Sequence, residues 1–166
     1  MKANNLTKGA ILVSINIILF YMSKIFDVLN LTLLTITSVI TCLSIIKFNV
    51  RSSVLIIVSS SISSIILGLI EYSLFYFLFF GTYPLFKFFI ENLNNIIIEI
   101  ILKLIYFNTL FLLIYFIYSK LFIMINLNFY ILLIWCISGT FIFILYDLFL
   151  TKIIRFVYNN PLIRKL

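Results

Sequence analysis

Residues 129–146 read FYILLIWCISGTFIFILY and contain no charged side chain. Residues 9–22 (GAILVSINIILFYM) and 53–70 (SVLIIVSSSISSIILGLI) have the same character. Such runs are apolar on every side, so water solvates them poorly, whereas about 20 apolar residues are enough for a helix to cross a bilayer. These stretches therefore predict membrane-spanning helices.

Composition extends this prediction to the whole chain. Hydrophobic residues make up 64% of the 166 residues and charged residues 10%, against about 45–50% and about 25% in soluble domains. We expect an all-α fold, because a chain in lipid must satisfy its backbone hydrogen bonds internally and the alternation of a barrel strand is absent. The sequence predicts one polytopic helix-bundle domain over residues 1–166. The excess of Ile, Phe, Asn and Lys matches AT-rich codons and suggests a low-GC bacterium.

Polar and basic breaks divide the chain into six predicted spans, at about residues 9–23, 29–46, 53–70, 72–93, 96–118 and 128–150. No small-residue cleavage site follows the first span, so we expect it to stay uncleaved. The fourth span is irregular, because Gly81 and Pro84 are expected to interrupt its helix between residues 72–80 and an amphipathic continuation at 85–93. The interruption leaves two alternatives, a cavity-lining broken helix or a short span that turns into an interfacial helix.

The basic residues predict the orientation in the cell membrane. With the N-terminus inside, the outer side receives only Lys24 and Lys120, and Lys103 lies within a span. The inner side receives the other nine basic residues: Lys2, Lys8, Lys47, Arg51, Lys87, Lys152, Arg155, Arg164 and Lys165. This asymmetry satisfies the positive-inside rule and places both termini in the cytoplasm. Anionic lipid headgroups are enough to account for the net charge of +7, so no nucleic-acid partner is expected.

Three charged residues are candidates for a functional or structural role inside the bundle. Glu99 and Lys103 are four residues apart, with the acid first, which is the favourable helical order for a pair. Charged side chains at membrane depth are costly and mark functional positions by default. Both could instead reach the headgroups from the inner end of the fifth span. Asp147 lies at a similar depth in the sixth span, and a contact between Lys103 and Asp147 is a hypothesis.

Uncharged polar residues within the spans provide further candidates. Asn16 and Asn108 are expected to form interhelical hydrogen bonds. Tyr83 could line a pocket, although an aromatic belt at the membrane interface is the favoured interpretation. Cys42 and Cys136 lack the spacing of a metal or redox motif. The chain has no histidine and shows no nucleophile–base pair or nucleotide-binding motif, so neither catalysis nor a metal or other cofactor is expected.

Small residues suggest where helices approach each other closely. Ser60, Ser64 and Gly68 recur every four residues and would share one helix face. Ala10 and Ser14 form a similar, shorter face in the first span. A hydroxyl-lined ligand groove is the alternative use of the serines, but close packing alone explains their spacing.

At the level of size and topology, the chain resembles two bacterial groups. One is the substrate-binding S component of energy-coupling-factor vitamin transporters, whose first helix carries small residues that dock a coupling subunit. Ala10 and Ser14 match that pattern, with Ser in place of Ala. The other group is the MreD-type membrane proteins that determine rod shape. The stretches FFGTYPLFKFFIE (79–91) and FILYDLFLTKII (143–154) are also similar to small uncharacterised multi-span proteins of low-GC bacteria.

We therefore expect a multi-pass, non-enzymatic membrane protein. The leading hypothesis is the small-molecule-binding subunit of a bacterial transporter, which would contact other membrane subunits. The alternative is a scaffold subunit of a cell-envelope or cell-shape complex. A pocket lined by Tyr72, Tyr83 or the serines of the third span would favour the transporter. A filled bundle with an exposed small-residue face would favour the scaffold.

Overall fold

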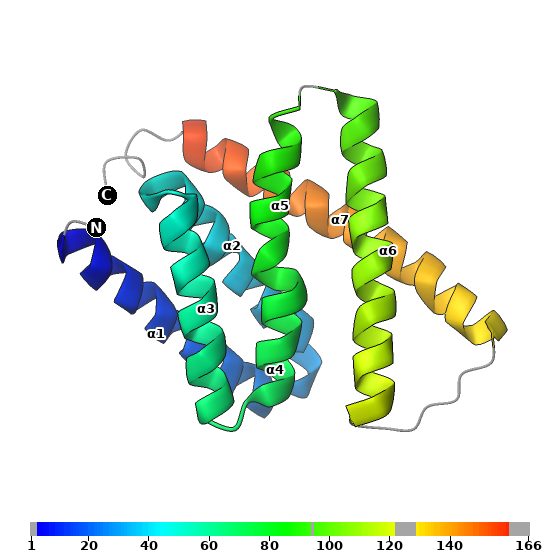
Figure 1. The fold of residues 1–166 in the computed structure, drawn as a ribbon, viewed down its shortest axis with the longest axis horizontal. Coiled ribbons are helices and arrows are strands. Elements are labelled where there is room, and N and C mark those ends of the chain that lie inside the picture. The colour runs from blue at the N-terminus through cyan, green and yellow to red at the C-terminus, as the bar shows by residue number, and fades with distance from the viewer. Residues whose placement is uncertain (1–2, 94, 122–128, 160–166) are drawn as a thin grey trace. The chain divides into compact units, whose positions relative to one another are not determined.

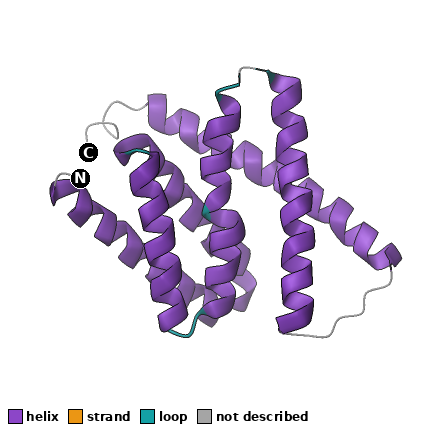
Figure 2. Ribbon diagram, in the orientation of Figure 1, coloured by secondary structure: helices purple, strands orange, loops and turns teal. Residues whose placement is uncertain are grey.

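The computed structural model describes residues 3–93, 95–121 and 129–159, and these form helices joined by short turns (Figures 1 and 2). The α-helices are α1 (Ala3–Ile25), α2 (Asn30–Phe48), α3 (Val50–Ile66), α4 (Ile70–Phe75), α5 (Thr82–Glu91), α6 (Ile96–Leu121) and α7 (Phe129–Asn159). A 3₁₀ turn, η1 (Asp27–Leu29), precedes α2, and a π-helical segment, η2 (Tyr76–Phe80), joins α4 to α5. The prediction of an all-α helix bundle is confirmed.

Five helical stretches are long and apolar enough to cross a membrane: Leu6–Ile25, Asn30–Phe48, Ile70–Glu91, Ile96–Ile117 and Ile134–Val157. The helix α3 is shorter, with 17 residues. At 1.5 Å per residue its length is about 26 Å, which is the lower end of what a crossing requires. The predicted spans thus correspond to six helices, if α4, η2 and α5 are counted as one.

The third helix ends earlier than the sequence predicted, and Gly68 is the reason. Gly68 has a φ of +76°, and its N–H bonds to the carbonyl of Ile65 while the N–H of Leu69 bonds to that of Ser64. This pair of bonds is the Schellman ending, in which glycine supplies the left-handed residue. A Cβ atom at Gly68 would have no neighbour within 4 Å. Its predicted place on a packing face is therefore wrong.

The fourth helix is continuous where the sequence predicted an interruption. The N–H of Gly81 bonds to the carbonyl of Tyr76, five residues back, which is the π pattern. Beyond it, Pro84 lies within α5 and has no N–H to donate. The hydroxyl of Thr82 donates to the carbonyl of Leu78, one turn earlier, at 2.7 Å. Both predicted alternatives, a broken helix and an interfacial helix after a turn, are corrected to one span.

The described residues form two compact units. The first contains the chain up to Phe86 together with the segment from Ile153, and the second contains Lys87–Lys152. The prediction of a single membrane domain stays a prediction.

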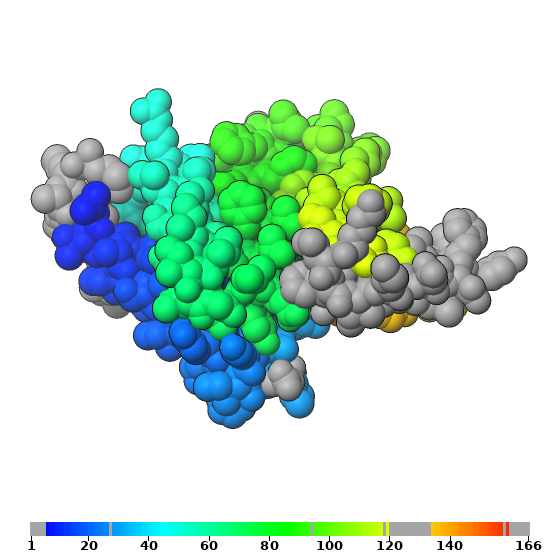
Figure 3. Space-filling view, turned by 60° about the horizontal axis from the view of Figure 1, so that its bottom comes forward, coloured from blue at the N-terminus to red at the C-terminus, as the bar shows by residue number. Residues whose placement is uncertain are grey.

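In the first unit, α3 lies beside α4 (Figure 1), and α1 packs on α2 and α3 through one face. That face carries Gly9, Asn16, Phe20 and Ser23, all buried. The opposite face of α1 is exposed, and its side chains lie on the molecular surface in the space-filling view (Figure 3). The connection from α2 to α3 is Asn49 alone, and the Ser44 hydroxyl donates to that of Ser53 at 2.7 Å between the two helices.

In the second unit, α6 packs on α7 through aromatic rings. The rings of Phe107 and Phe143 stack with their centroids 4.7 Å apart. Gly139 makes this approach possible, because a Cβ atom there would lie 3.2 Å from the Phe107 ring. This contact holds α6 and α7 together one turn from the charged residues of the same two helices.

Candidate functional site

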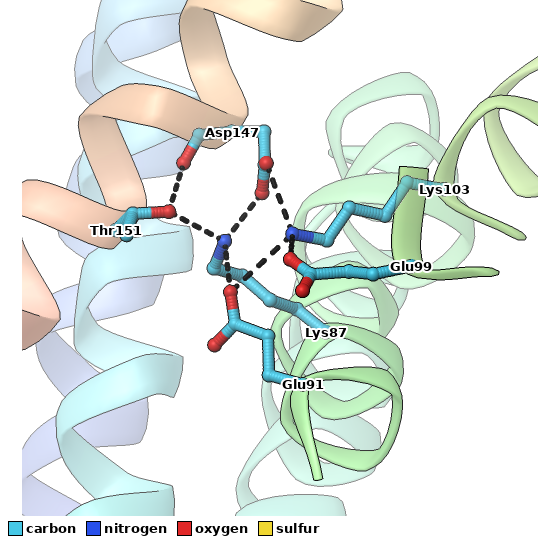
Figure 4. A network of polar contacts seen from close by, with 6 residues as sticks. All are labelled: Lys87, Glu91, Glu99, Lys103, Asp147 and Thr151. Carbon is cyan, nitrogen blue, oxygen red and sulfur yellow. Dashed lines mark hydrogen bonds and ion pairs between the residues drawn. The ribbon is translucent and has the colours of Figure 1, made fainter. Parts of the chain in front are cut away.

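The most unusual feature of the second unit is a fully buried lysine. The Lys87 side chain has 0% relative exposure. Its ammonium lies 2.5 Å from Asp147 Oδ1 and 2.7 Å from Glu91 Oε1, and it donates to the hydroxyl of Thr151 at 2.7 Å. An ammonium has three N–H donors, so every donor of Lys87 has an acceptor (Figure 4).

A second lysine, Lys103, completes the arrangement from α6. Its Nζ lies 2.5 Å from Glu99 Oε1, 3.0 Å from Asp147 Oδ2 and 3.3 Å from Glu91 Oε1. Lys103 is also buried, and its three donors are matched by three carboxylate oxygens. The Lys103–Asp147 contact, a hypothesis from the sequence, is thus present in the structure and links α6 to α7.

Helical spacing brings these side chains together. Lys87 and Glu91 are four residues apart on α5, and Glu99 and Lys103 are four apart on α6, so each pair shares one helix face. On α7, Thr151 follows Asp147 by one turn, and its hydroxyl donates to the Asp147 carbonyl at 2.9 Å. That bond uses the only hydrogen of the Thr151 hydroxyl, which leaves its oxygen free to accept from Lys87.

Four of the charges form a closed ring of alternating sign. Lys87 contacts Asp147, Asp147 contacts Lys103, Lys103 contacts Glu91, and Glu91 contacts Lys87. Glu99 lies outside this ring and contacts Lys103 alone. The ring is neutral when all its members are ionised, and Glu99 adds one negative charge. We call the four ring residues with Glu99 the charge network.

The surroundings of the charge network determine its chemistry. The carboxylates are partly open, with relative side-chain exposures of 33% for Glu91, 27% for Glu99 and 17% for Asp147. The described residues contain no group of three or more His, Cys, Asp or Glu side chains placed to hold a metal ion. The lysines occupy the space between the acids, and each lysine donor is paired within the network or with Thr151.

A second polar centre lies in the first unit around Tyr76. Asn16 Nδ2 donates to the Tyr76 hydroxyl at 3.2 Å, and Thr41 Oγ1 lies 3.2 Å from the same oxygen. The Thr41 hydroxyl also bonds to the Thr37 carbonyl at 3.1 Å. Asn16 thus forms an interhelical hydrogen bond, while its Oδ1 accepts none from the described residues.

The other polar candidates occupy separate positions. Asn108 donates to the Leu104 carbonyl of its own helix at 2.9 Å and accepts from the Cys136 thiol of α7 at 3.0 Å. Tyr83 is fully buried and stacks on Phe79 with ring centroids 6.0 Å apart. Its burial contradicts the favoured interpretation of a lipid-facing belt residue. Neither residue joins the charge network.

The two predicted packing faces differ in exposure, and their role in packing stays a prediction. Ser60 and Ser64 are buried, and their hydroxyls donate to carbonyls one turn earlier in α3 at 2.6 and 2.7 Å. Ala10 and Ser14 are exposed, because the packed face of α1 is the one that carries Gly9 and Asn16.

Sequence reasoning missed Lys87 and Glu91. The positive-inside assignment placed Lys87 on the inner side, and Glu91 fell in the amphipathic continuation at 85–93 without an assigned role. The four-residue spacing of Lys87 and Glu91 was the available signal, and it repeats the spacing of Glu99 and Lys103 after the next turn. Once the helix is continued through Pro84, both pairs lie close to the turn between α5 and α6.

Comparisons of this chain with known protein families, with curated proteins and with solved structures find no significant match.

Proposed function

We propose that the protein is a multi-pass membrane subunit of a transporter that takes part in moving a small molecule without catalysing a reaction. The charge network supports this proposal. Five ionisable side chains within candidate spans are costly in lipid, and such groups characteristically line substrate, ion or proton pathways. A purely structural contact between α6 and α7 is already supplied by Phe107 and Phe143.

The proposal includes an orientation with both termini in the cytoplasm. Because Lys87 is buried, it no longer counts among the basic residues of the inner side. The basic residues of the outer side are still Lys24 and Lys120. Eight basic residues still fall on the inner side: Lys2, Lys8, Lys47, Arg51, Lys152, Arg155, Arg164 and Lys165. Lys2, Arg164, Lys165 and the side chain of Lys120 lie outside the described residues. The asymmetry continues to favour this orientation, which places the turn between α5 and α6 on the inner side.

A scaffold role in a cell-envelope or cell-shape complex is the second candidate. The first unit favours it, because Tyr83, Ser60 and Ser64 are buried among other side chains. Ala10 and Ser14 instead present small side chains on the exposed face of α1. Small residues let another membrane helix approach closely, which suits both an S-component-like docking helix and an MreD-like scaffold.

Affinity purification of the tagged full-length chain in mild detergent distinguishes the two candidates. Recovery of an ATPase and a membrane coupling subunit would support the transporter. Recovery of cell-wall synthesis or shape proteins would support the scaffold and overturn the transporter. If the well-folded chain recovers neither set, both proposals are contradicted.

A variant on the exposed face of α1 tests the docking contact in the same experiment. Ser14→Leu fills the small-residue face, so we expect partner recovery to fall at least several-fold. Ile18→Leu on the exposed side of the same helix keeps side-chain volume and is the matched control. Equal recovery with Ser14→Leu and Ile18→Leu would exclude this face as the docking surface.

A further inference from the structure

We infer that the polar centre around Tyr76 in the first unit binds one monovalent cation. The oxygens of this centre come from four helical segments: Asn16 of α1, Thr41 of α2, Ser60 of α3 and Tyr76 of η2. The inference concerns a site other than the charge network of the second unit. It goes beyond the proposed function and does not depend on it.

The carboxamide of Asn16 is the group that points to a ligand. Asn16 has 0% relative exposure, and its Nδ2 donates to the Tyr76 hydroxyl at 3.2 Å, so the carboxamide faces the polar centre. Its Oδ1 belongs to the same planar group and accepts no hydrogen bond from the described residues. A buried acceptor without a partner costs free energy, so a ligand that brings positive charge to this oxygen stabilises the folded chain.

Hydroxyl oxygens complete the polar centre. Thr41 Oγ1 lies 3.2 Å from the Tyr76 hydroxyl, and the Ser60 hydroxyl lies close to the same side chain. The hydroxyls of Thr41 and Ser60 donate to carbonyls of their own helices at 3.1 and 2.6 Å. A hydroxyl oxygen has two lone pairs and can still accept after it has donated. These oxygens can therefore coordinate a cation together with Asn16 Oδ1.

The neutrality of these oxygens determines the class of cation. Among the described residues, the buried charged side chains are Lys87 and Lys103, and both belong to the second unit. Divalent calcium and magnesium are bound through carboxylates, and softer metals through thiolate or imidazole groups. Neutral oxygens can replace the hydration shell of a monovalent ion, as backbone carbonyls do in potassium-selective filters. The oxygen set therefore suits an alkali cation.

The position of the polar centre also fits an ion site. Asn16, Thr41 and Ser60 each lie near the middle of their helix. In membrane transport proteins, ion sites lie near the bilayer midplane beside irregular helices. Tyr76 is the first residue of the π-helical segment η2, and π segments are frequent at functional sites. Depth and backbone irregularity thus agree with the set of oxygens.

Thermal unfolding of the purified full-length protein in detergent tests the inference. The Tm is measured in sodium, potassium and choline chloride at equal concentration, because choline supplies the ionic strength without a small cation. A ligand that binds only the folded chain raises its stability. We expect the Tm to be higher by at least about 2 °C in one alkali salt than in choline chloride. Asn16→Leu and Thr41→Val each remove an oxygen of the site and should abolish this difference.

Thr37→Val is the matched control. Thr37 is buried one turn from Thr41, and its hydroxyl donates to the Leu34 carbonyl of its own helix at 2.7 Å, so this variant should keep the difference between the salts. Thr41→Val nearly preserves side-chain volume and keeps the test valid if Asn16→Leu fails to fold.

Three results would overturn the inference. Equal Tm values of the wild type in the three salts would leave a buried water molecule as the partner of Asn16. A difference that persists in Thr41→Val, or one that is lost in Thr37→Val, would show that the cation does not bind at the polar centre. The measurement needs neither a partner protein nor a transported molecule, so its failure refutes the cation site alone. A purification without transporter subunits refutes the proposed function alone.

Discussion

At the scale of single residues, the charge network is held by Lys87 as much as by Lys103. Both lysines contact Asp147 and Glu91, and this shared pairing changes how the network can be tested. Exchanging Lys103 and Asp147 would place a lysine next to Lys87 and an aspartate next to Glu91 and Glu99. The exchanged protein would then fail even though the native contact exists, so neutral substitutions are the informative ones.

The close packing around Gly81 in the first unit leads to a prediction about stability. A Cβ atom there would lie 3.0 Å from Ile57 Cγ2 and 3.0 Å from the Tyr76 carbonyl oxygen. Gly81→Ala is therefore expected to lower the free energy of unfolding by about 1–3 kcal/mol, the usual cost of overpacking. Unfolding of the detergent-solubilised protein, followed by circular dichroism, measures this change.

Gly9→Ala is the control for Gly81→Ala. A Cβ atom at Gly9 would meet Ile56 at 3.8 Å, an ordinary contact. Alanine also has a higher helix propensity than glycine by up to about 1 kcal/mol, so Gly9→Ala should be neutral or stabilising. Equal losses for the two variants would show that α3 does not approach Gly81 closely.

At the scale of elements, the π-helical segment η2 explains how one helix continues past Gly81 and Pro84. A π segment corresponds to one residue inserted into an α-helix. Deleting Phe77, whose side chain is exposed, should convert η2 to a regular α-helix and keep the residues on either side in register. We expect this deletion to be tolerated better than deletion of Phe89 in α5, which rotates Ile90 and Glu91 by about 100°.

Unfolding measurements on the two deletions provide the comparison, with retained helix content as the first criterion. If deleting Phe77 is as damaging as deleting Phe89, the π segment does not absorb the missing residue. The account of the fourth helix would then be wrong.

Element positions were largely predictable because apolar runs and polar breaks decide which segments become helices in lipid. The predicted start of α6 at Ile96 agrees with the structure. Helix ends and interruptions that depend on local backbone hydrogen bonds could not be predicted from hydropathy. Gly68 ended α3 by a left-handed turn, and Pro84 continued a helix that its residue type predicts to stop. Both outcomes depend on hydrogen bonds that hydropathy does not report.

At the scale of the whole molecule, orientation can be tested with single cysteines. Lys24 lies in the last turn of α1 and Lys47 in the last turn of α2, and both are exposed. With Cys42 and Cys136 replaced by Ala, Lys24→Cys should react with an impermeant thiol reagent added outside intact cells. Lys47→Cys should react only after the cells are opened. Labelling of position 47 from outside would reverse the proposed orientation.

Only part of the candidate site could be predicted from the sequence. Glu99, Lys103 and Asp147 stand out because each is a charge within an apolar run. Lys87 and Glu91 follow a proline and a glycine that were expected to interrupt the helix, so neither was expected to meet the charges of the next two helices. The closed ring depends on the exact spacing along α5, α6 and α7, and only three-dimensional packing determines which charges meet.

The closed ring of charges around the two buried lysines is the central claim, and a double-mutant cycle on Lys87 and Asp147 tests it most directly. The measurement is the free energy of unfolding of Lys87→Met, Asp147→Asn and the double variant, with Lys152→Met as the exposed-lysine control. Each single variant should cost about 3 kcal/mol, because it leaves a partly buried charge with one partner fewer, whereas Lys152→Met should cost less than about 0.5 kcal/mol. The double variant should cost at least about 1 kcal/mol less than the sum of the single variants. Additive losses would mean that Lys87 and Asp147 do not interact, and the ring would be contradicted.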